Sequence, residues 1–149
     1  MSVPTEADFA IIKPGDGATP TEVFNAICGI ENVSVNVAVS GTDRYRRDCA
    51  KPGALATRKN ITNGISQTIT GGGAMSIEWM TSFAALLGTV RNYKIELRQR
   101  NGSDAGLLLG TFAGAYVMMT NNITTDSNGN SSGEITLNSE GAWTWTPAS

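Results

Sequence analysis

The chain has 149 residues, of which 40% are hydrophobic and 16% charged, and its formal net charge is −2. This length favours one domain over residues 1–149. The low charge leaves Ser, Thr, Asn and Gly to cover the surface, which is typical of β-structure and its turns. The chain has no histidine, so the commonest general base and the commonest zinc ligand are both missing. We therefore expect no enzyme, no cofactor and no metal site.

The charges are unevenly distributed along the chain. Residues 1–43 carry one base and six acids, residues 44–100 carry ten bases and three acids, and residues 101–149 carry four acids and no base. Blocks of opposite sign can pair within one subunit or between neighbouring copies. Non-specific DNA binders usually have an overall basic balance. We therefore do not expect this chain to be one of them.

No apolar run follows a basic start, and no stretch of about 18 apolar residues occurs, so we expect neither a secretory signal nor a membrane span. Cys28 and Cys49 are the only cysteines. We expect two free thiols in a cytosolic product, although the spacing leaves a disulfide or a reactive thiol open.

In chain order, the first expected element is a short N-terminal helix. Thr19-Pro20-Thr21-Glu22 has the pattern of a capping box with proline at the first helical position, and Gly29 is a suitable helix end. The following stretch "VSVNVAVS", residues 33–40, alternates valine with small or polar residues. Branched residues at period two predict a half-buried strand.

Residues 41–59 break this alternation and hold six bases, one proline and two glycines. A long basic loop is predicted here, and loops of this length are usually functional or disordered. Arginines 44, 46 and 47 could bind phosphate with Tyr45 stacking, or the loop could contact another protein surface. The acidic blocks elsewhere favour the contact. We expect the contact residues to be Asp43, Arg44, Tyr45, Arg46, Arg47, Asp48, Arg58 and Lys59.

The stretch "NITNGISQTIT", residues 60–70, predicts a Thr-rich strand with Ile61, Ile65 and Ile69 on one face. No Lys-Ser/Thr pair follows the three glycines at 71–73, so they predict a strand-to-helix hinge rather than a phosphate-binding loop. Ser76 is a suitable cap for a second helix, ending at Gly88. Its expected core residues are Ile77, Met80, Phe83 and Leu87.

The rest of the chain predicts further strands. "RNYKIELRQR", residues 91–100, alternates cleanly, with Tyr93, Ile95 and Leu97 expected to point inward. A strand over 106–119, a turn at 128–129 and two short strands over 134–138 and 142–146 follow. Five to seven strands and two helices indicate a mainly β protein. We expect a β-sandwich or partly open barrel with one flanking α-helix and a short N-terminal helix.

The order of these features resembles the major tail protein, or tail tube protein, of long-tailed bacteriophages. The resemblance rests on "GATPTEVFNAICGIENVSVNV", on the loop beginning "GTDRYRRD", and on the closing "GTFAGAYVMMTNNITTDSNGNSSGEITLNSEGAW". The basic cluster at 44–47 departs from the more acidic loop associated with such proteins.

The resemblance implies a structural protein whose six-membered rings stack into a hollow tail tube for genome delivery. It also implies tape-measure, tail terminator and baseplate or tip proteins as partners. Double-stranded DNA would pass without sequence-specific binding. The location implied is the virion tail, assembled in the host bacterial cytoplasm.

A tube of this kind should not present bases to its bore, because each phosphate contact would hold the DNA. We therefore expect the face of Lys94, Arg98 and Arg100 to point away from the bore. An exterior position in ordinary solvent stays open for each lumen candidate. The lumen-facing candidates are Ser34, Asn36, Thr62, Ser66, Thr68, Glu134 and Thr136.

Two alternatives remain open at this stage. One is the related inner-tube protein of a contractile injection system, which carries effectors instead of DNA. The other is a monomeric carbohydrate-binding β-sandwich with Trp79, Trp143 or Trp145 as a stacking platform.

Overall fold

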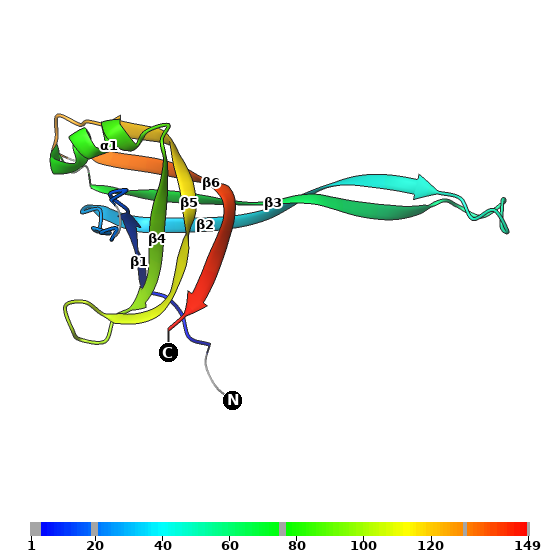
Figure 1. The fold of residues 1–149 in the computed structure, drawn as a ribbon, viewed down its shortest axis with the longest axis horizontal. Coiled ribbons are helices and arrows are strands. Elements are labelled where there is room, and N and C mark those ends of the chain that lie inside the picture. The colour runs from blue at the N-terminus through cyan, green and yellow to red at the C-terminus, as the bar shows by residue number, and fades with distance from the viewer. Residues whose placement is uncertain (1–3, 19–20, 75–76, 130, 149) are drawn as a thin grey trace.

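The computed structural model describes residues 4–18, 21–74, 77–129 and 131–148. Its strands and its α-helix are β1 (Phe9–Pro14), β2 (Ile30–Arg46), β3 (Thr57–Ala74), α1 (Met80–Leu86), β4 (Val90–Gln99), β5 (Leu107–Thr124) and β6 (Ser132–Pro147). The strands form one antiparallel six-stranded sheet in the order β1-β4-β5-β6-β3-β2. Figure 1 shows this sheet curled into a body with α1 on its flank, from which β2 and β3 extend as a long arm.

The mainly β class with a flanking helix is therefore confirmed, in the form of a partly open barrel. The strand order leaves β1 and β2 as the two edges of the sheet. These edges approach one another where the amide of Ile27, just before β2, donates to the carbonyl oxygen of Ile12 at 3.0 Å. The curled sheet therefore brings its last strand, β2, close to its first strand, β1, but these two strands do not pair and the barrel stays open.

The core lies inside this curl. It is built by inward-facing strand residues and by two side chains of α1, and its largest fully buried aromatic pair, Tyr93 and Tyr116, meets edge to face at 6.0 Å. Full burial of one large apolar side chain stabilises the fold by roughly 1.5–3 kcal/mol. The core cluster comprises Ile12, Ile27, Ile69, Phe83, Leu86, Tyr93, Ile95, Tyr116, Met118, Ile135 and Leu137.

The prediction of an N-terminal helix is wrong for the described part of that segment. Thr19 and Pro20 lie outside the described residues, and residues 21–29 contain no helical turn. Phe24 instead forms an antiparallel bridge with Gly15. The Glu22 carboxylate, expected to cap a helix, accepts hydrogen bonds from the Gly17 amide at 2.9 Å and from Asn92 at 3.0 Å. Because Gly17 and Asn92 donate to its carboxylate, Glu22 is held in an extended segment instead of capping a helix.

The predicted long loop at 41–59 is also corrected. Strand β2 continues to Arg46 and β3 begins at Thr57, so only residues 47–56 connect them. All residues of β2 from Ser34 except Val35 are exposed. The valine alternation ends at Val39, and the outer residues 40–46 have none, because neither face of the two-stranded ribbon is buried there within one copy of the chain.

The glycines at 71–73 do not form a hinge, because they lie inside β3. A side chain at Gly73 would overlap the carbonyl oxygen of Gly29 and lie 2.8 Å from the amide nitrogen of Glu31. Glycine therefore allows β2 to approach β3 closely here. The two short strands expected at 134–138 and 142–146 are one continuous strand, β6, which bends near Gly141 at a φ of 87°.

The flanking helix is shorter than expected and presents a different face. Ser76 lies outside the described residues, Ile77–Trp79 form a 3-10 turn, and α1 follows. Phe83 is buried and Met80 packs against the core, but Ile77 and Leu87 are 65% and 47% exposed. Leu86 is buried instead. The tighter first turn and the end of the helix before Leu87 shift the buried stripe away from the α-helical period.

Candidate assembly surfaces

A polar face covers the side of β2, β3 and β6 opposite the core. Ser34 pairs with Thr70, and Thr70 pairs with Thr136 on the next strand. Their chain neighbours Ile69 and Ile135 point into the core, so these polar side chains point outward. The polar face consists of Ser34, Asn36, Ser66, Thr68, Thr70, Glu134, Thr136 and Asn138. Six of the seven lumen candidates therefore lie on one surface.

The chemistry of the polar face is uniform. Glu134 is the one charged residue in the set, and the others carry small hydroxyl or amide groups. The surface is hollowed beside Asn32, Ser34, Thr70, Asn122 and Glu134, and no lysine or arginine lines that hollow in the described part of the chain. Such a surface has no cation with which to hold a phosphate.

Thr62 is the lumen candidate that the structure separates from the others. The register changes between Ser40, which pairs with Gly64, and Gly41, which pairs with Thr62. This β-bulge leaves Asn63 as an extra residue, and its side chain accepts a hydrogen bond from the Ser40 hydroxyl at 2.9 Å. Beyond the bulge Thr62 lies on the opposite face of the ribbon. The same bulge takes Ile61 out of the row of Ile65 and Ile69, which corrects the expectation of one shared face.

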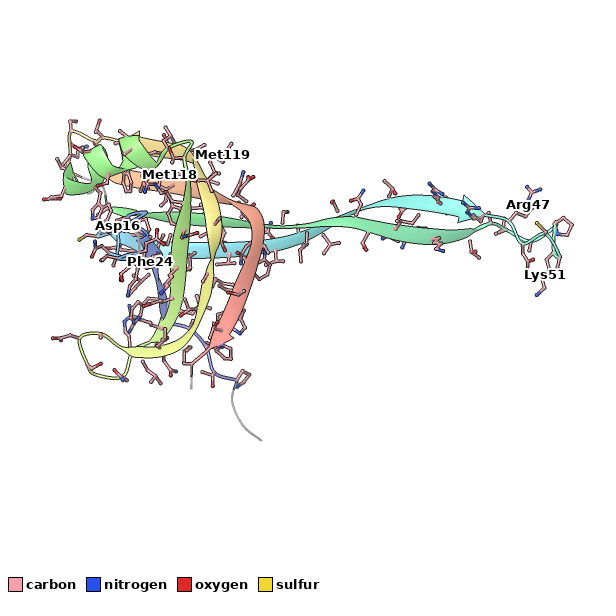
Figure 2. The ribbon with its side chains drawn as sticks, in the orientation of Figure 1. Asp16, Phe24, Arg47, Lys51, Met118 and Met119 are labelled. Carbon is pink, nitrogen blue, oxygen red and sulfur yellow. The ribbon has the colours of Figure 1, made fainter. Side chains whose placement is uncertain are left out.

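The arm consists of residues 37–46 and 57–67 with the tip 47–56. Beyond the bulge one face carries Arg44 opposite Lys59, and the other carries Tyr45 opposite Arg58. Arg47 lies at the far end of the arm (Figure 2). The expected contact residues thus belong to the strands and tip of the arm rather than to one loop. Asp43 and Arg58 are 3.9 Å apart and well exposed, so this ion pair adds little stability.

An apolar strip runs along the inner part of the arm. Val37, Val39 and Ile65 are 44%, 60% and 64% exposed, and they continue the row that begins with the half-buried Val35. Leu55, in the tip, is 94% exposed. A two-stranded ribbon alone is marginally stable in water, and exposed apolar clusters mark interaction surfaces. Sequence reasoning missed this strip because the valine alternation looks the same inside the barrel and outside it.

The bases of β4 lie on another part of the sheet and are engaged by neighbours. Lys13 and Arg98 both contact the Glu96 carboxylate, at 3.0 Å and 2.5 Å. Burial would raise the pKa of Glu96, but the hydrogen bonds from Arg98 and Lys13 outweigh burial and lower it. Lys94 lies over the Phe24 ring at 4.4 Å. Strand β5 separates β4 from β6, so these cations are set apart from the polar face.

The tryptophans do not combine into one exposed platform. Trp143 and Trp145 pack against Phe112 at ring distances of 5.8 Å and 4.7 Å, and Trp79 stacks on Phe83 at 6.1 Å. Their packing partners lie on two different elements, β5 and α1, although Trp145 is still 43% exposed. This arrangement gives no support to the carbohydrate-binding alternative.

Both cysteines are free and exposed. Across the part of the chain that the structure describes, no three His, Cys, Asp or Glu side chains gather closely enough to hold a metal ion. None of the helical segments in that same part is both long and apolar enough for a membrane crossing.

Solved structures share this architecture. A chain from the tail of an empty gene transfer agent particle, refined as a helix with C6 symmetry, superposes with a TM-score of 0.67 at 17% identity, over 96% of this chain and 99% of that chain. A chain of the SPP1 tail tube superposes with a TM-score of 0.60 at 10% identity, over 97% of this chain and 80% of that chain. The chain has the tail tube fold. At 17% and 10% sequence identity, the similarity to these two chains shows a shared fold.

The tail tube fold extends to another kind of assembly. A chain of the sheath–tube complex of the extracellular contractile injection system PVC, in its extended state, superposes with a TM-score of 0.60 at 18% identity, over 97% of this chain and 93% of that chain. No protein-family model matches the sequence, and neither does a curated protein. The assignment to the tail tube fold therefore rests on three-dimensional structure.

Proposed function

We propose that this chain is the subunit of a hollow tube in a virion tail, a structural protein without enzymatic activity. The observation that carries the proposal is the arm. Its apolar strip, Val37, Val39 and Ile65, is exposed in one copy and needs another surface to cover it. The tail tube fold supports a second copy of the chain as the source of that surface.

A ring of copies solves the problem of unpaired strand edges. Strands β1 and β2 are the edges of the sheet, and β3 pairs with β6 only up to Asn138, so the later part of β6 lacks β3 as a partner. Free edges promote pairing with other chains, and closure around a ring removes them. We propose six copies per ring, in line with the C6 symmetry of the gene transfer agent tail.

The polar face is the proposed wall of the bore. Small neutral side chains and one carboxylate per subunit, Glu134, would let double-stranded DNA pass without sequence-specific binding. In a six-membered ring, Glu134 would supply one acidic group from each copy at the same height. The cations of β4 would lie away from this wall, because β5 separates β4 from β6.

Stacked rings make an open filament, because the two sides of a ring differ and the contact does not close on itself. Other proteins must therefore start and end the tube. We propose a tape-measure protein, a tail terminator and a baseplate or tip protein for these roles, with assembly in the host bacterial cytoplasm.

An inner tube of a contractile injection system is the second candidate function. The similarity to a chain of the PVC sheath–tube complex supports it. The two candidates differ in cargo, since a tail tube carries DNA and the injection tube carries effectors. A phage-like gene neighbourhood would favour the tail tube.

Negative-stain electron microscopy of the purified protein tests the proposal. We expect rings or hollow rods at high protein concentration. A homogeneous monomer at every concentration and salt condition would overturn the tube.

The bore assignment has its own test. Glu134→Cys, in a chain with Cys28→Ser and Cys49→Ser, is labelled with a thiol-reactive gold cluster before assembly. We expect label density inside the bore, and for the control Leu55→Cys we expect it elsewhere. Density from the Glu134 site on the outer wall would reject the polar face as lumen while leaving the tube intact.

A further inference from the structure

A groove separates the two edge strands of the curled sheet. We call it the seam groove, and it is lined by residues 8–11, 30–32, 100, 102–104 and 106, with a volume of about 780 Å³. The apolar side chains of Phe9, Ile11 and Ile30 belong to its lining. Neither β1 nor β2 has a second strand on the side that faces this groove. Its edges are therefore open to a further chain segment.

The rim of the seam groove is acidic. Asp8, Glu31 and Asp104 are exposed carboxylates in its lining, and among the described residues Arg100 is the one base there. Asp8 accepts a hydrogen bond from the Arg100 amide at 2.8 Å, and the Arg100 guanidinium lies 5.8 Å from the centre of the Phe9 ring. Glu31 and Asp104 form no ion pair with any described residue. Their charges are available to a cationic partner.

The tip of the arm has the complementary character. Together with the adjoining strand ends, residues 44–46 and 57–59, the tip carries six bases and one acid. That acid, Asp48, shapes the tip, because its carboxylate accepts the Ala50 amide at 2.9 Å and its carbonyl oxygen accepts the Lys51 amide at 3.0 Å. Leu55 also belongs to the tip, and 94% of its surface is exposed. The tip is thus an apolar side chain surrounded by positive charge.

We propose that the tip of the arm docks into the seam groove of a neighbouring copy. Leu55 would contact the apolar lining of Phe9, Ile11 and Ile30, while the bases of the tip would meet Glu31 and Asp104. The arm carries its tip far from the body, so the tip does not reach the seam groove of its own chain (Figures 1 and 2). Apolar insertion supplies affinity and charge complementarity supplies orientation. This inference rests on the proposed self-assembly and names the surface that the arm contacts.

Other depressions fit the tip less well. The hollow of the polar face offers one carboxylate, Glu134, and no large apolar lining except Val33. The groove beside α1 contains Asp16, but that carboxylate already accepts the Ala18 and Val23 amides, and Arg91 lines the same groove. The seam groove combines apolar lining with unengaged carboxylates.

A charge exchange between the two surfaces tests the inference. The tip variant is Arg46→Glu with Arg47→Glu, and the groove variant is Glu31→Lys with Asp104→Lys. We expect each to raise the protein concentration needed for assembly by roughly tenfold or more, with the monomer's melting temperature nearly unchanged. The four substitutions together should restore assembly to within a few-fold of the original chain. The control, Asp126→Lys, reverses an exposed acid that lies outside both the groove and the free strand edges, and it should assemble normally.

Crosslinking gives a second, direct measurement. In a chain with Cys28→Ser and Cys49→Ser, the pair Leu55→Cys and Glu31→Cys should form disulfides between copies when assemblies are oxidised. Non-reducing electrophoresis would then show a ladder of covalent oligomers. The control pair, Leu55→Cys with Asp126→Cys, should show none.

The outcomes separate this inference from the proposed function. If the original chain forms no ring or tube, the proposed function fails. If tubes form and both exchange variants assemble like the original, the docking site is wrong while the tube stands. Failure of the combined exchange to restore assembly, or tubes without the crosslinked ladder, would also overturn the docking site.

Discussion

The hydroxyl of Tyr116 donates a hydrogen bond to Oε1 of Gln67 inside the barrel, where both side chains are almost completely buried. Gln67 is also the residue at which β3 leaves β6. The last paired residues are Thr68 and Asn138, and one residue further the Gln67 amide donates to the Ser139 hydroxyl at 3.0 Å. At the base of the arm, the Ser139 hydroxyl thus takes the place of the backbone carbonyl that would accept this hydrogen bond in a regular pair of strands. These three residues fix the point at which the arm departs from the body.

Removal of the hydroxyl in Tyr116→Phe should lower the free energy of unfolding by about 1–3 kcal/mol, because Oε1 of Gln67 loses its donor in a buried site. Gln67→Leu should lower the free energy of unfolding by a similar amount. The double variant should lower the free energy of unfolding by less than the sum of the two single variants. It leaves neither the Tyr116 hydroxyl nor Oε1 of Gln67 buried without its partner. Urea unfolding of the monomer measures all three, with the exposed Tyr45→Phe as a control that stays within about 0.5 kcal/mol. Strictly additive costs would show that the pair is not coupled.

The buried tyrosines predict a loss of stability at alkaline pH. Burial raises the pKa of Tyr93 and of Tyr116 from 10.0 to about 12. Both groups must stay neutral in the folded chain, so their stabilising contribution is full below pH 10 and is lost as the pH rises toward 12. Tyrosinate absorbance should show Tyr93 and Tyr116 titrating at higher pH in the folded chain than in urea. The Tyr93→Phe and Tyr116→Phe variants should each lose one of these late-titrating groups, and a folded chain in which neither group titrates later than in urea would refute the assignment.

The ion-paired Glu96 predicts a loss of stability at acid pH. Its pKa in the folded chain is lowered from 4.5 by Arg98 and Lys13, against the opposing effect of burial. A lowered pKa gives stability that is present above pH 4.5 and is lost as the pH falls through the folded value. Glu96→Gln should lower the free energy of unfolding at neutral pH by roughly 1–3 kcal/mol. It should also flatten the acid limb of the stability curve. An unchanged acid limb would mean that other carboxyl groups dominate there.

The glycine run in β3 predicts a contrast between adjacent positions. Gly73→Ala should destabilise the chain by on the order of 1–3 kcal/mol, because the added methyl group meets the backbone of Gly29 and Glu31. Gly72→Ala is the matched control, since the nearest atom to its methyl group is the carbonyl oxygen of Gly133 at 3.6 Å. Thermal unfolding of both variants would measure the difference. Equal melting temperatures would show that β2 can shift away from β3 without cost.

Local pattern was sufficient for the strands and for most of the polar face. The alternations at 33–40, 60–70 and 91–100 are local properties of the chain; the first two lie within strands, and the third lies within β4 except for its last residue, Arg100. The same alternation placed small polar residues together on β2, β3 and β6. The absence of histidine likewise removes the commonest general base, and this is visible in the sequence alone.

Contacts between distant segments account for the differences. Glu22 has the spacing of a helix cap, yet Asn92, far along the chain, holds it in an extended segment. The bulge at Ser40 and Gly41 moves Thr62 to the other face, and no local pattern marks it. Val35 and Val39 occupy equivalent positions in one alternating row, but Val35 packs against the core and Val39 is exposed. Periodicity assigns residues to the two faces of a strand, whereas the cover over each face depends on where neighbouring strands separate, as β6 separates from β3 after Asn138.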